Sequence, residues 1–280
     1  MREKIMLEIG HALDVGLMRK GKENQDALIV LHSKGFNRKP PLLIVADGMG
    51  GYNGGALASK LVIDTMTRHY QKAKRDENPI DVLFMGVLSA HSVIMRRAMQ
   101  EPQLQKMGST VVAAVIDGDM LSLVNVGDSH AYIVNENEIQ QINWDHSLVA
   151  DELRSGNITQ EEVRNYPQKN ILTMSLSAQR PEIEPSTLTR KLEPGDHVVL
   201  CSDGLWGPVT DSQIQAVVLE LQAQRAADKL VEMANANQGP DNISVIVAKR
   251  SNTTQTSAET AQFNTIAQSR NDETRPISLK

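Results

Sequence analysis

The sequence predicts an α+β protein in which antiparallel β-sheets are covered on the outside by helices. Two observations favour this class. Short β-type segments cluster in meanders joined by turns of a few residues, and they do not alternate strictly with helices as they would in a doubly wound fold. The 280 residues, 40% of them apolar, can bury a sizeable core in one large domain or two small ones.

The individual elements follow from local patterns. The predicted strands, which are rich in β-branched residues between turn residues, cover 27–33, 41–46, 110–117, 120–126, 130–135, 138–142, 184–190, 197–201 and 242–249. Apolar residues recur every three or four positions at 55–73 and 80–100, which predicts two helices. A polar stretch at 147–165 also favours helix, and a last pair of helices is predicted near 211–235. The turn at Asn135-Glu136-Asn137 indicates a hairpin.

Composition excludes several classes of protein. A net charge of −5 lacks the basic surface of a nucleic-acid binder. We find neither the apolar run of a signal peptide nor a stretch of about 18 apolar residues that would span a membrane. Cys201 is the sole cysteine, so a disulfide within the chain is impossible and a cytoplasmic setting is expected. Residues 1–250 are expected to form the folded domain, followed by a Ser/Thr/Gln-rich tail, 251–280, that is too polar to order itself.

The most informative pattern is a set of aspartates at the ends of β-type segments. Four segments carry it, at 42–51, 123–130, 198–207 and 239–247. A strand end fixes a carboxylate at the rim of a rigid sheet, and the neighbouring glycine or other turn residue lets the backbone turn. Four such carboxylates in one domain indicate a site for hard divalent cations such as Mg or Mn, because these prefer oxygen ligands.

Several aspartates, Asp26 among them, also have a simpler interpretation. Asp47 could be only a helix-capping residue, and Asp26, Asp128 and Asp241 could be turn residues. The glycine-rich turn after Asp47 does not match a dinucleotide fingerprint, because its third glycine position is Asn53.

Cysteine and histidine chemistry finds little support in the sequence. No arginine follows Cys201 closely enough to make it a phosphocysteine nucleophile, so Cys201 is expected to be a buried strand residue. His91 is expected in the core, and no histidine shows the paired spacing of a zinc site.

Taken in order, the motifs resemble those of the metal-dependent serine/threonine protein phosphatases (type 2C, or PPM), in their bacterial form. The resemblance covers residues 8–250. It is carried by Asp14-Val-Gly-Leu-Met-Arg19, Asn24-Gln25-Asp26, Val45-Ala-Asp47-Gly-Met-Gly-Gly51, Met107-Gly-Ser-Thr110, Val126-Gly-Asp128-Ser129, Asp145-His-Ser147, Cys201-Ser-Asp203-Gly204 and Gly239-Pro-Asp241-Asn242. Any one of these motifs is weak, but all of them in the family's order are specific.

The resemblance implies a four-layer α-β-β-α sandwich with metals at one end. It implies that Asp47, Asp203 and Asp241 hold one cation, and that Asp47 with the Gly48 carbonyl holds a second. By the same resemblance, Asp26 acts mainly through metal-bound waters, and Asp128 joins Asp203 at a third metal. The region 145–175 would form a flap beside the site.

The implied reaction is attack on phosphorus by a water that bridges two Mn or Mg ions about 4 Å apart. Arg19 matches the family's phosphate-binding arginine, but it lies seven residues before Asp26, about two more than is usual. Lys22 is therefore an alternative phosphate ligand. Gln25 stands where the family has Glu, His130 where Arg is common, and Tyr166 where a flap His is frequent. Met49 replaces the His of eukaryotic members, so the proton donor stays unassigned.

The main functional hypothesis is a protein serine/threonine phosphatase with Mn2+ or Mg2+ as cofactor. Its expected partners are phosphorylated proteins and a cognate Ser/Thr kinase or its substrates, and it is expected to be a monomer in the cytoplasm that binds neither nucleic acid nor membrane. One alternative is a catalytically weak pseudophosphatase that binds phosphoproteins or a kinase. Another is a phosphatase of anti-sigma antagonists with the same fold.

Overall fold

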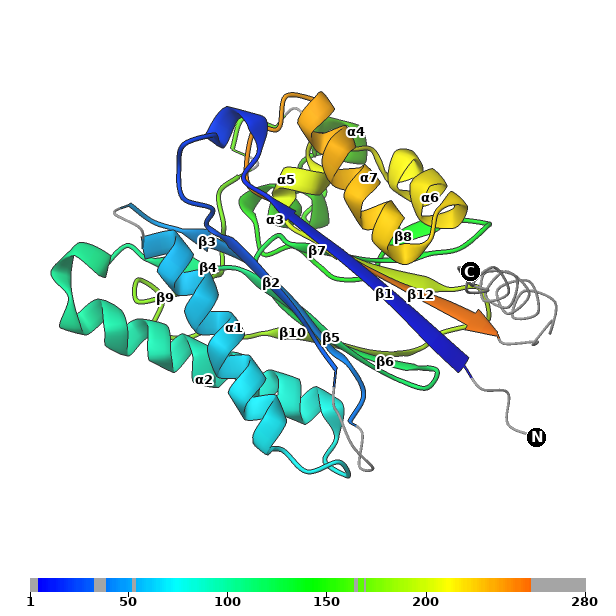
Figure 1. The fold of residues 1–280 in the computed structure, drawn as a ribbon. Helices are drawn as coiled ribbons and strands as arrows, with labels where there is room; N and C mark the ends of the chain where they lie inside the picture. The colour runs from blue at the N-terminus through cyan, green and yellow to red at the C-terminus, as the bar shows by residue number, and fades with distance from the viewer. Residues whose placement is uncertain (1–4, 33–38, 52–53, 164–165, 169, 253–280) are drawn as a thin grey trace, which may run out of the picture.

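The computed structural model describes residues 5–32, 39–51, 54–163, 166–168 and 170–252. Two antiparallel sheets face each other, and helices cover their outer faces (Figure 1). The α+β class and the α-β-β-α layering expected from the sequence are confirmed.

The first sheet has five strands and carries two helices on its outer face. Its strands, in spatial order, are β1 (Ile5–Asp14), β12 (Ile243–Asn252), β11 (His197–Cys201), β7 (His130–Val134) and β8 (Ile139–Gln141). The helices are α6 (Asp211–Glu220) and α7 (Ala223–Ala236), of which α7 packs on β1 and β12. Three short helices lie near one end, α3 (Leu148–Arg154), α4 (Gln160–Val163) and α5 (Asp203–Trp206).

The second sheet has seven strands and is covered by the two longest helices. Its strands are β10 (Ser186–Lys191), β6 (Met120–Val126), β5 (Val111–Asp117), β3 (Leu42–Met49), β4 (Gly108–Ser109) and β9 (Leu176–Ser177), with β2 (Asp26–Leu31) paired to β3. The helices are α1 (Gly54–Lys72) and α2 (Pro79–Gln100). The described ranges also contain two 3-10 turns, η1 (Leu17–Arg19) and η2 (Pro102–Leu104).

The middle layers explain why the strands read as continuous apolar runs. In β3, Leu42 and Ile44 face the core under α1 and α2, whereas Leu43 and Val45 face the core between the sheets. A strand that is buried on both faces needs apolar residues at every position, and an alternating pattern would leave polar groups in one of the two cores.

Helix α2 begins where its sequence supplies a cap. The Asn78 side chain accepts a hydrogen bond from the Ile80 amide, and Pro79 occupies the first helical position, which needs no amide donor. By length and composition α2 also passes the test for a membrane span, which the sequence was not expected to contain. Its buried side chains belong to the core between the helices and the second sheet, as in a core helix of a globular domain.

The sequence prediction missed several elements. The largest is β1, which pairs with β12 over its whole length. Its apolar residues are interrupted by Gly10, where a side chain would clash with the backbone of Ala223 on α7, 2.3 Å away. Strands β4 and β9 and helix α5 are four residues long or shorter, and such short pieces carry no periodicity that could be recognised. Residues 253–280 lie outside the described part of the chain, so the predicted polar tail stays a prediction.

Candidate metal-dependent active site

Antiparallel pairing brings the first two aspartates together. Strand β2 begins at Asp26 and β3 ends just beyond Asp47, and the two residues stand opposite each other in the ladder. The sequence pattern placed Asp47 just after its strand. The structure instead places it within β3, which extends to Met49. Neighbouring residues on the two strands are held by the Gly48 amide, which donates to the Gln25 carbonyl at 3.0 Å.

The first sheet delivers the other three aspartates to the same end of the sandwich. Asp203 follows the end of β11, Asp241 precedes the start of β12, and Asp128 lies between β6 and β7. The ladder pairs Cys201 with Val245 and with His130, so all three strand ends meet at one edge. The sheet register thus gathers carboxylates from positions far apart in the sequence.

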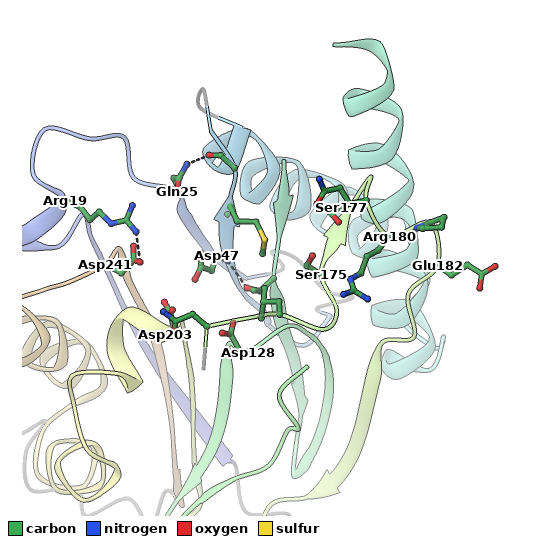
Figure 2. A pocket seen from close by; sticks show the side chains of 18 residues that line it. Arg19, Gln25, Asp47, Asp128, Ser175, Ser177, Arg180, Glu182, Asp203 and Asp241 are labelled. Atoms are coloured by element: carbon green, nitrogen blue, oxygen red, sulfur yellow. Dashed lines mark hydrogen bonds and ion pairs between the residues drawn. The ribbon is translucent and has the colours of Figure 1, made fainter. Parts of the chain in front are cut away.

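A cavity of about 770 Å³ opens between these strand ends. One side is formed by residues that the sequence analysis singled out, namely Arg19, Asp47, Gly48, Asp128, Asp203 and Asp241. Figure 2 shows the labelled members of this set, Arg19, Asp47, Asp128, Asp203 and Asp241, around one side of the cavity, with Ser175, Ser177 and Arg180 of the β9 segment opposite. Asp26 is buried behind this surface and does not line the cavity.

The crowded carboxylates perturb one another. Burial, followed by repulsion from neighbouring aspartates, raises the pKa of Asp47 and of Asp128 well above the ordinary value, and the pKa of Asp203 is raised for the same reasons. Burial raises the pKa of Asp26 to about 7 despite hydrogen bonds from serines. Placing so much like charge in one buried cluster is costly, and a bound cation would remove that cost.

The donor set fits hard divalent cations. All the candidate side-chain ligands are carboxylates, and the Oδ1 atom of Asp203 is buried with no hydrogen-bond partner in the part of the chain that the structure describes. No group of three or more His, Cys, Asp or Glu side chains in the described ranges is arranged as a ready-made metal site. The side chains share the cavity, and the individual ligand roles stay predictions.

Both carboxylate oxygens of Asp241 accept hydrogen bonds. Its Oδ2 atom accepts a hydrogen bond from Nη2 of Arg19 at 2.7 Å, and its Oδ1 atom accepts from the Asn242 amide at 2.8 Å. Arg19 therefore supplies the positive charge beside one of the proposed metal ligands.

Arg19 lies at the end of a 3-10 turn that is anchored to the segment before β12. Residues 17–19 form η1, where the Leu17 amide donates to the Asn235 side chain and the Met18 amide donates to the Gly239 carbonyl. With this anchoring, the Arg19 guanidinium lines the cavity. Lys22, the alternative phosphate ligand, is exposed and does not line the cavity.

Asp26 is held by serines of the first sheet. Ser202 donates from Oγ to Oδ2 of Asp26 at 2.6 Å, and the same Ser202 oxygen accepts from the Ser244 amide at 3.1 Å. Both serines are fully buried. This contact joins the two sheets directly beneath the aspartate cluster, which agrees with a supporting role for Asp26 behind the ligands that face the cavity.

Gln25 stands where Glu was expected, so it brings no charge to the site, and it forms two hydrogen bonds to neighbouring segments. Its Nε2 atom donates to the Gly50 carbonyl at 3.1 Å, and its backbone amide donates to the Asn242 side chain at 2.8 Å. It thereby connects the glycine-rich turn after β3 with the segment that carries Asp241.

Several supporting residues escaped the sequence analysis. Thr110 accepts from the Asp47 amide through Oγ1 at 3.1 Å, and Trp206 donates from Nε1 to the Asp128 carbonyl at 3.0 Å. The indole of Trp206 also stacks on the ring of His130, with centroids 4.3 Å apart. Thr110 lay in a quoted motif without a role, whereas nothing in the sequence marked the contact of Trp206.

The predicted burial of Cys201 and of His91 is confirmed. Cys201 is fully buried, and burial raises the pKa of its thiol well above the ordinary value, so it is a poor nucleophile. His91 is buried on α2. His130 and His146 are occupied by hydrogen bonds to Asp145 and to the Gly127 amide, respectively.

Comparison with known proteins agrees with this geometry. The family model for protein phosphatase 2C matches residues 16–244. The chain is 36% identical over 207 residues to the serine/threonine protein phosphatase PstP of Mycobacterium tuberculosis, covering 74% of this chain and 40% of that protein. It is 33% identical over 214 residues to the serine/threonine phosphatase stp of Listeria welshimeri, covering 75% of this chain and 84% of the relative.

A solved structure gives the same answer for the fold. The catalytic domain of PstP in complex with two manganese ions is 32% identical and superposes with a TM-score of 0.76, covering 88% of this chain and 99% of that one. The chain therefore belongs to the protein phosphatase 2C family. It spans less than half the length of the mycobacterial relative, and over that span it corresponds to the relative's catalytic domain.

Proposed function

We propose that this protein is a Mn- or Mg-dependent phosphatase that hydrolyses phosphoserine and phosphothreonine in proteins. The observation that carries the proposal is the meeting of Asp47, Asp128, Asp203 and Asp241 in one cavity, where Asp203 Oδ1 is buried and has no hydrogen-bond partner among the described residues. Membership of the protein phosphatase 2C family supports it independently.

In this proposal the chain provides oxygen ligands that hold the cations and a carboxylate, Asp26, that supports them from behind. Asp47, Asp203 and Asp241 hold one cation, Asp47 with the Gly48 carbonyl holds the second, and Asp128 with Asp203 forms a third, weaker site. When bound, the two core cations would lower the pKa of a coordinated water and neutralise charge on the phosphoryl group. The chain's own contribution is to hold these oxygens on rigid strand ends and to keep Asp26 hydrogen-bonded behind them.

Arg19 is the group that would orient the phosphate. Its guanidinium lines the cavity beside Asp241, and a guanidinium can hold two phosphate oxygens at once. Lys22 is exposed outside the lining, so we assign the phosphate to Arg19. Cys201 has no role, because direct attack by water forms no covalent intermediate with the protein.

The test is turnover of a phosphothreonine peptide with Mn2+, with chelator, and in the variants Asp47→Asn and Asp203→Asn. We expect activity to require metal and to fall by about 100-fold or more in both variants, because each removes a charge from the ligand set. Asp64→Asn, an exposed aspartate on α1, is the matched control. Chelator-resistant turnover, or full activity in both variants, would overturn the mechanism.

A second candidate is a pseudophosphatase that binds phosphoproteins or a kinase without turnover. Gln25 favours it, because its side chain is used to connect the glycine-rich turn to its neighbours and brings no charge to the site. A protein that binds phosphopeptide and Mn2+ yet releases no phosphate would establish this candidate. Phosphatase action on anti-sigma antagonists stays an alternative choice of substrate for the same chemistry.

We also propose that the catalytic unit ends with β12 and that residues beyond it do not take part in the reaction. Strand β12 extends to Asn252, so a truncation should begin at residue 253. Removal of residues 253–280 should leave turnover of p-nitrophenyl phosphate unchanged, and a large loss would show that the tail contributes to the catalytic domain. The proposed partners are phosphorylated proteins and a kinase that produces them, in the cytoplasm.

A further inference from the structure

The cavity is larger than its proposed catalytic groups require. A volume of about 770 Å³ is in the range that accommodates a drug-sized ligand, and a single phosphoryl group fills a small part of it. The side opposite the aspartates is formed by the segment around β9, which we call the β9 wall and define as Ser175, Ser177, Gln179 and Arg180. None of these residues has a place in the mechanism proposed above.

The β9 wall carries one charged side chain that faces inward. Figure 2 shows the guanidinium of Arg180 directed into the cavity, past Ser175, whereas the carboxylate of Glu182 is directed away from it. Among the described residues Arg180 makes no side-chain hydrogen bond or ion pair, in contrast to Arg19, which is bound to Asp241. Arg180 is thus available to a ligand.

The backbone beneath Arg180 is anchored. Strand β9 pairs with β4, and the Arg180 amide donates to the Ser177 carbonyl at 3.3 Å, which closes a tight turn. His91 of α2 is buried and lies against the backbone of Arg180 and Pro181, although neither of its ring nitrogens forms a hydrogen bond within the described ranges. The turn therefore presents Arg180 from a position fixed by a strand and a helix.

The charge balance of the cavity indicates what Arg180 would bind. With two divalent cations in place, the four carboxylates of Asp47, Asp128, Asp203 and Asp241 are formally neutralised. Glu182 also lines the cavity, but its carboxylate is directed away from it, so the inward-facing groups that remain charged are the guanidiniums of Arg19 and Arg180. The other side chains of the β9 wall are polar donors and acceptors. A planar guanidinium in such a position recognises carboxylate or phosphate oxygens with two parallel hydrogen bonds.

We propose that the β9 wall is a second anion subsite, in which Arg180 binds an acidic or phosphorylated side chain that flanks the target phosphoresidue. This inference rests on the proposed function and names the substrate class of the same site. Peptides with Asp, Glu or a second phosphate within a few residues of the target are the preferred substrates, and peptides with Lys or Arg at those positions are disfavoured.

The test compares four phosphothreonine peptides that differ only in their flanking residues. These are neutral, acidic, basic and doubly phosphorylated, with p-nitrophenyl phosphate as a substrate that has no flank. We expect wild-type protein to show kcat/KM about fivefold higher on the acidic than on the neutral peptide, as one charge-assisted contact at an accessible site would give. Comparison of the acidic with the doubly phosphorylated peptide shows whether Arg180 binds a flanking carboxylate or a flanking phosphate.

Variants at Arg180 then assign the preference. Arg180→Ala should abolish it, Arg180→Lys should retain part of it, and Arg180→Glu should reverse it toward the basic peptide. Arg225→Ala, an exposed arginine on α7, is the control and should behave as wild type. An Arg180→Ala protein that keeps the wild-type preference would overturn the subsite. An equal loss on all peptides and on p-nitrophenyl phosphate would overturn it too, because Arg180 would then act on the target phosphate itself.

A binding measurement separates this proposal from the function on which it rests. In an Asp203→Asn background, fluorescence polarisation of labelled peptides should show the same acidic preference and the same loss in Arg180→Ala. If the wild-type protein hydrolyses the neutral peptide only with metal but binds all flanks equally, the subsite is refuted and the phosphatase function stands. If it hydrolyses none of the substrates yet binds acidic flanks through Arg180, the function is refuted and the subsite stands.

Discussion

The Nη2 atom of Arg19 lies 2.7 Å from Oδ2 of Asp241, which joins the proposed phosphate ligand to a proposed metal ligand across 222 positions of the sequence. The two side chains are one-third and slightly more than one-third exposed, so the pair by itself adds little to stability. Its significance is positional, because it directs the guanidinium toward the aspartate cluster.

The first prediction concerns the choice between Arg19 and Lys22. Arg19→Ala should lower kcat/KM on a phosphopeptide by about tenfold or more, because a two-pronged contact to phosphate is lost, and Arg19→Lys should recover a part of it. Lys22→Ala should have a much smaller effect, since Lys22 lies outside the cavity lining. Equal losses at the two positions would contradict this assignment.

The second prediction is a pH dependence of stability in the metal-free protein. The pKa values of Asp47, Asp128 and Asp203 are raised in the folded state, and that of Asp26 is raised to about 7. The folded protein therefore binds more protons than the unfolded chain above the unfolded pKa of Asp, near 4. The free energy of unfolding must fall as the pH rises from about 4 to about 7.

Thermal unfolding in chelator at pH 5 and pH 8 measures this slope. The melting temperature should be higher at pH 5, Asp26→Asn should reduce the difference, and Asp64→Asn should not. Saturating Mn2+ should raise the melting temperature most at pH 8, where the carboxylates are ionised. A metal-free protein that is more stable at pH 8 would show that the carboxylates do not repel one another as the structure implies.

The third prediction uses two glycines of the same turn. A side-chain carbon at Gly48 would lie 2.0 Å from the Gly55 carbonyl oxygen, whereas one at Gly51 would meet nothing within 4 Å. Gly48→Ala should therefore destabilise the fold by several kcal/mol, of the order seen for severe steric conflicts, and Gly51→Ala should be nearly neutral. Urea unfolding of the two variants checks this, and similar midpoints would refute the close approach.

The fourth prediction concerns the sole cysteine. Cys201 is fully buried with a raised thiol pKa, and its side chain packs in the core under α6 and α7. Iodoacetamide should leave the folded protein unmodified and active but should alkylate it in denaturant. Cys201→Ala should keep metal-dependent turnover and lose stability by about 1–3 kcal/mol, as small core truncations do. Inactivation of the folded protein in step with alkylation would return Cys201 to the mechanism.

Much of the fold could be predicted because its signals are local. The long helices α1 and α2, the hairpin of β7 and β8, and most strands lie within a few residues of their predicted bounds, since apolar periodicity and turn residues act over short distances. Strand β1 could not be recognised in the same way. Its pairing with β12 and the close contact of Gly10 with α7 depend on residues more than 200 positions away.

For the site too, local sequence patterns predicted some features and the tertiary structure decided others. The sequence by itself determined which aspartates belong to the cluster, that Cys201 is buried, and the class of fold that carries them. Only the tertiary structure decided that Arg19 pairs with Asp241, that Ser202 holds Asp26, that Gln25 connects the glycine-rich turn, and that Arg180 faces the cavity from the opposite wall. Each of these contacts joins segments of different strands or turns. Their geometry is set by sheet register and packing, which no local pattern specifies.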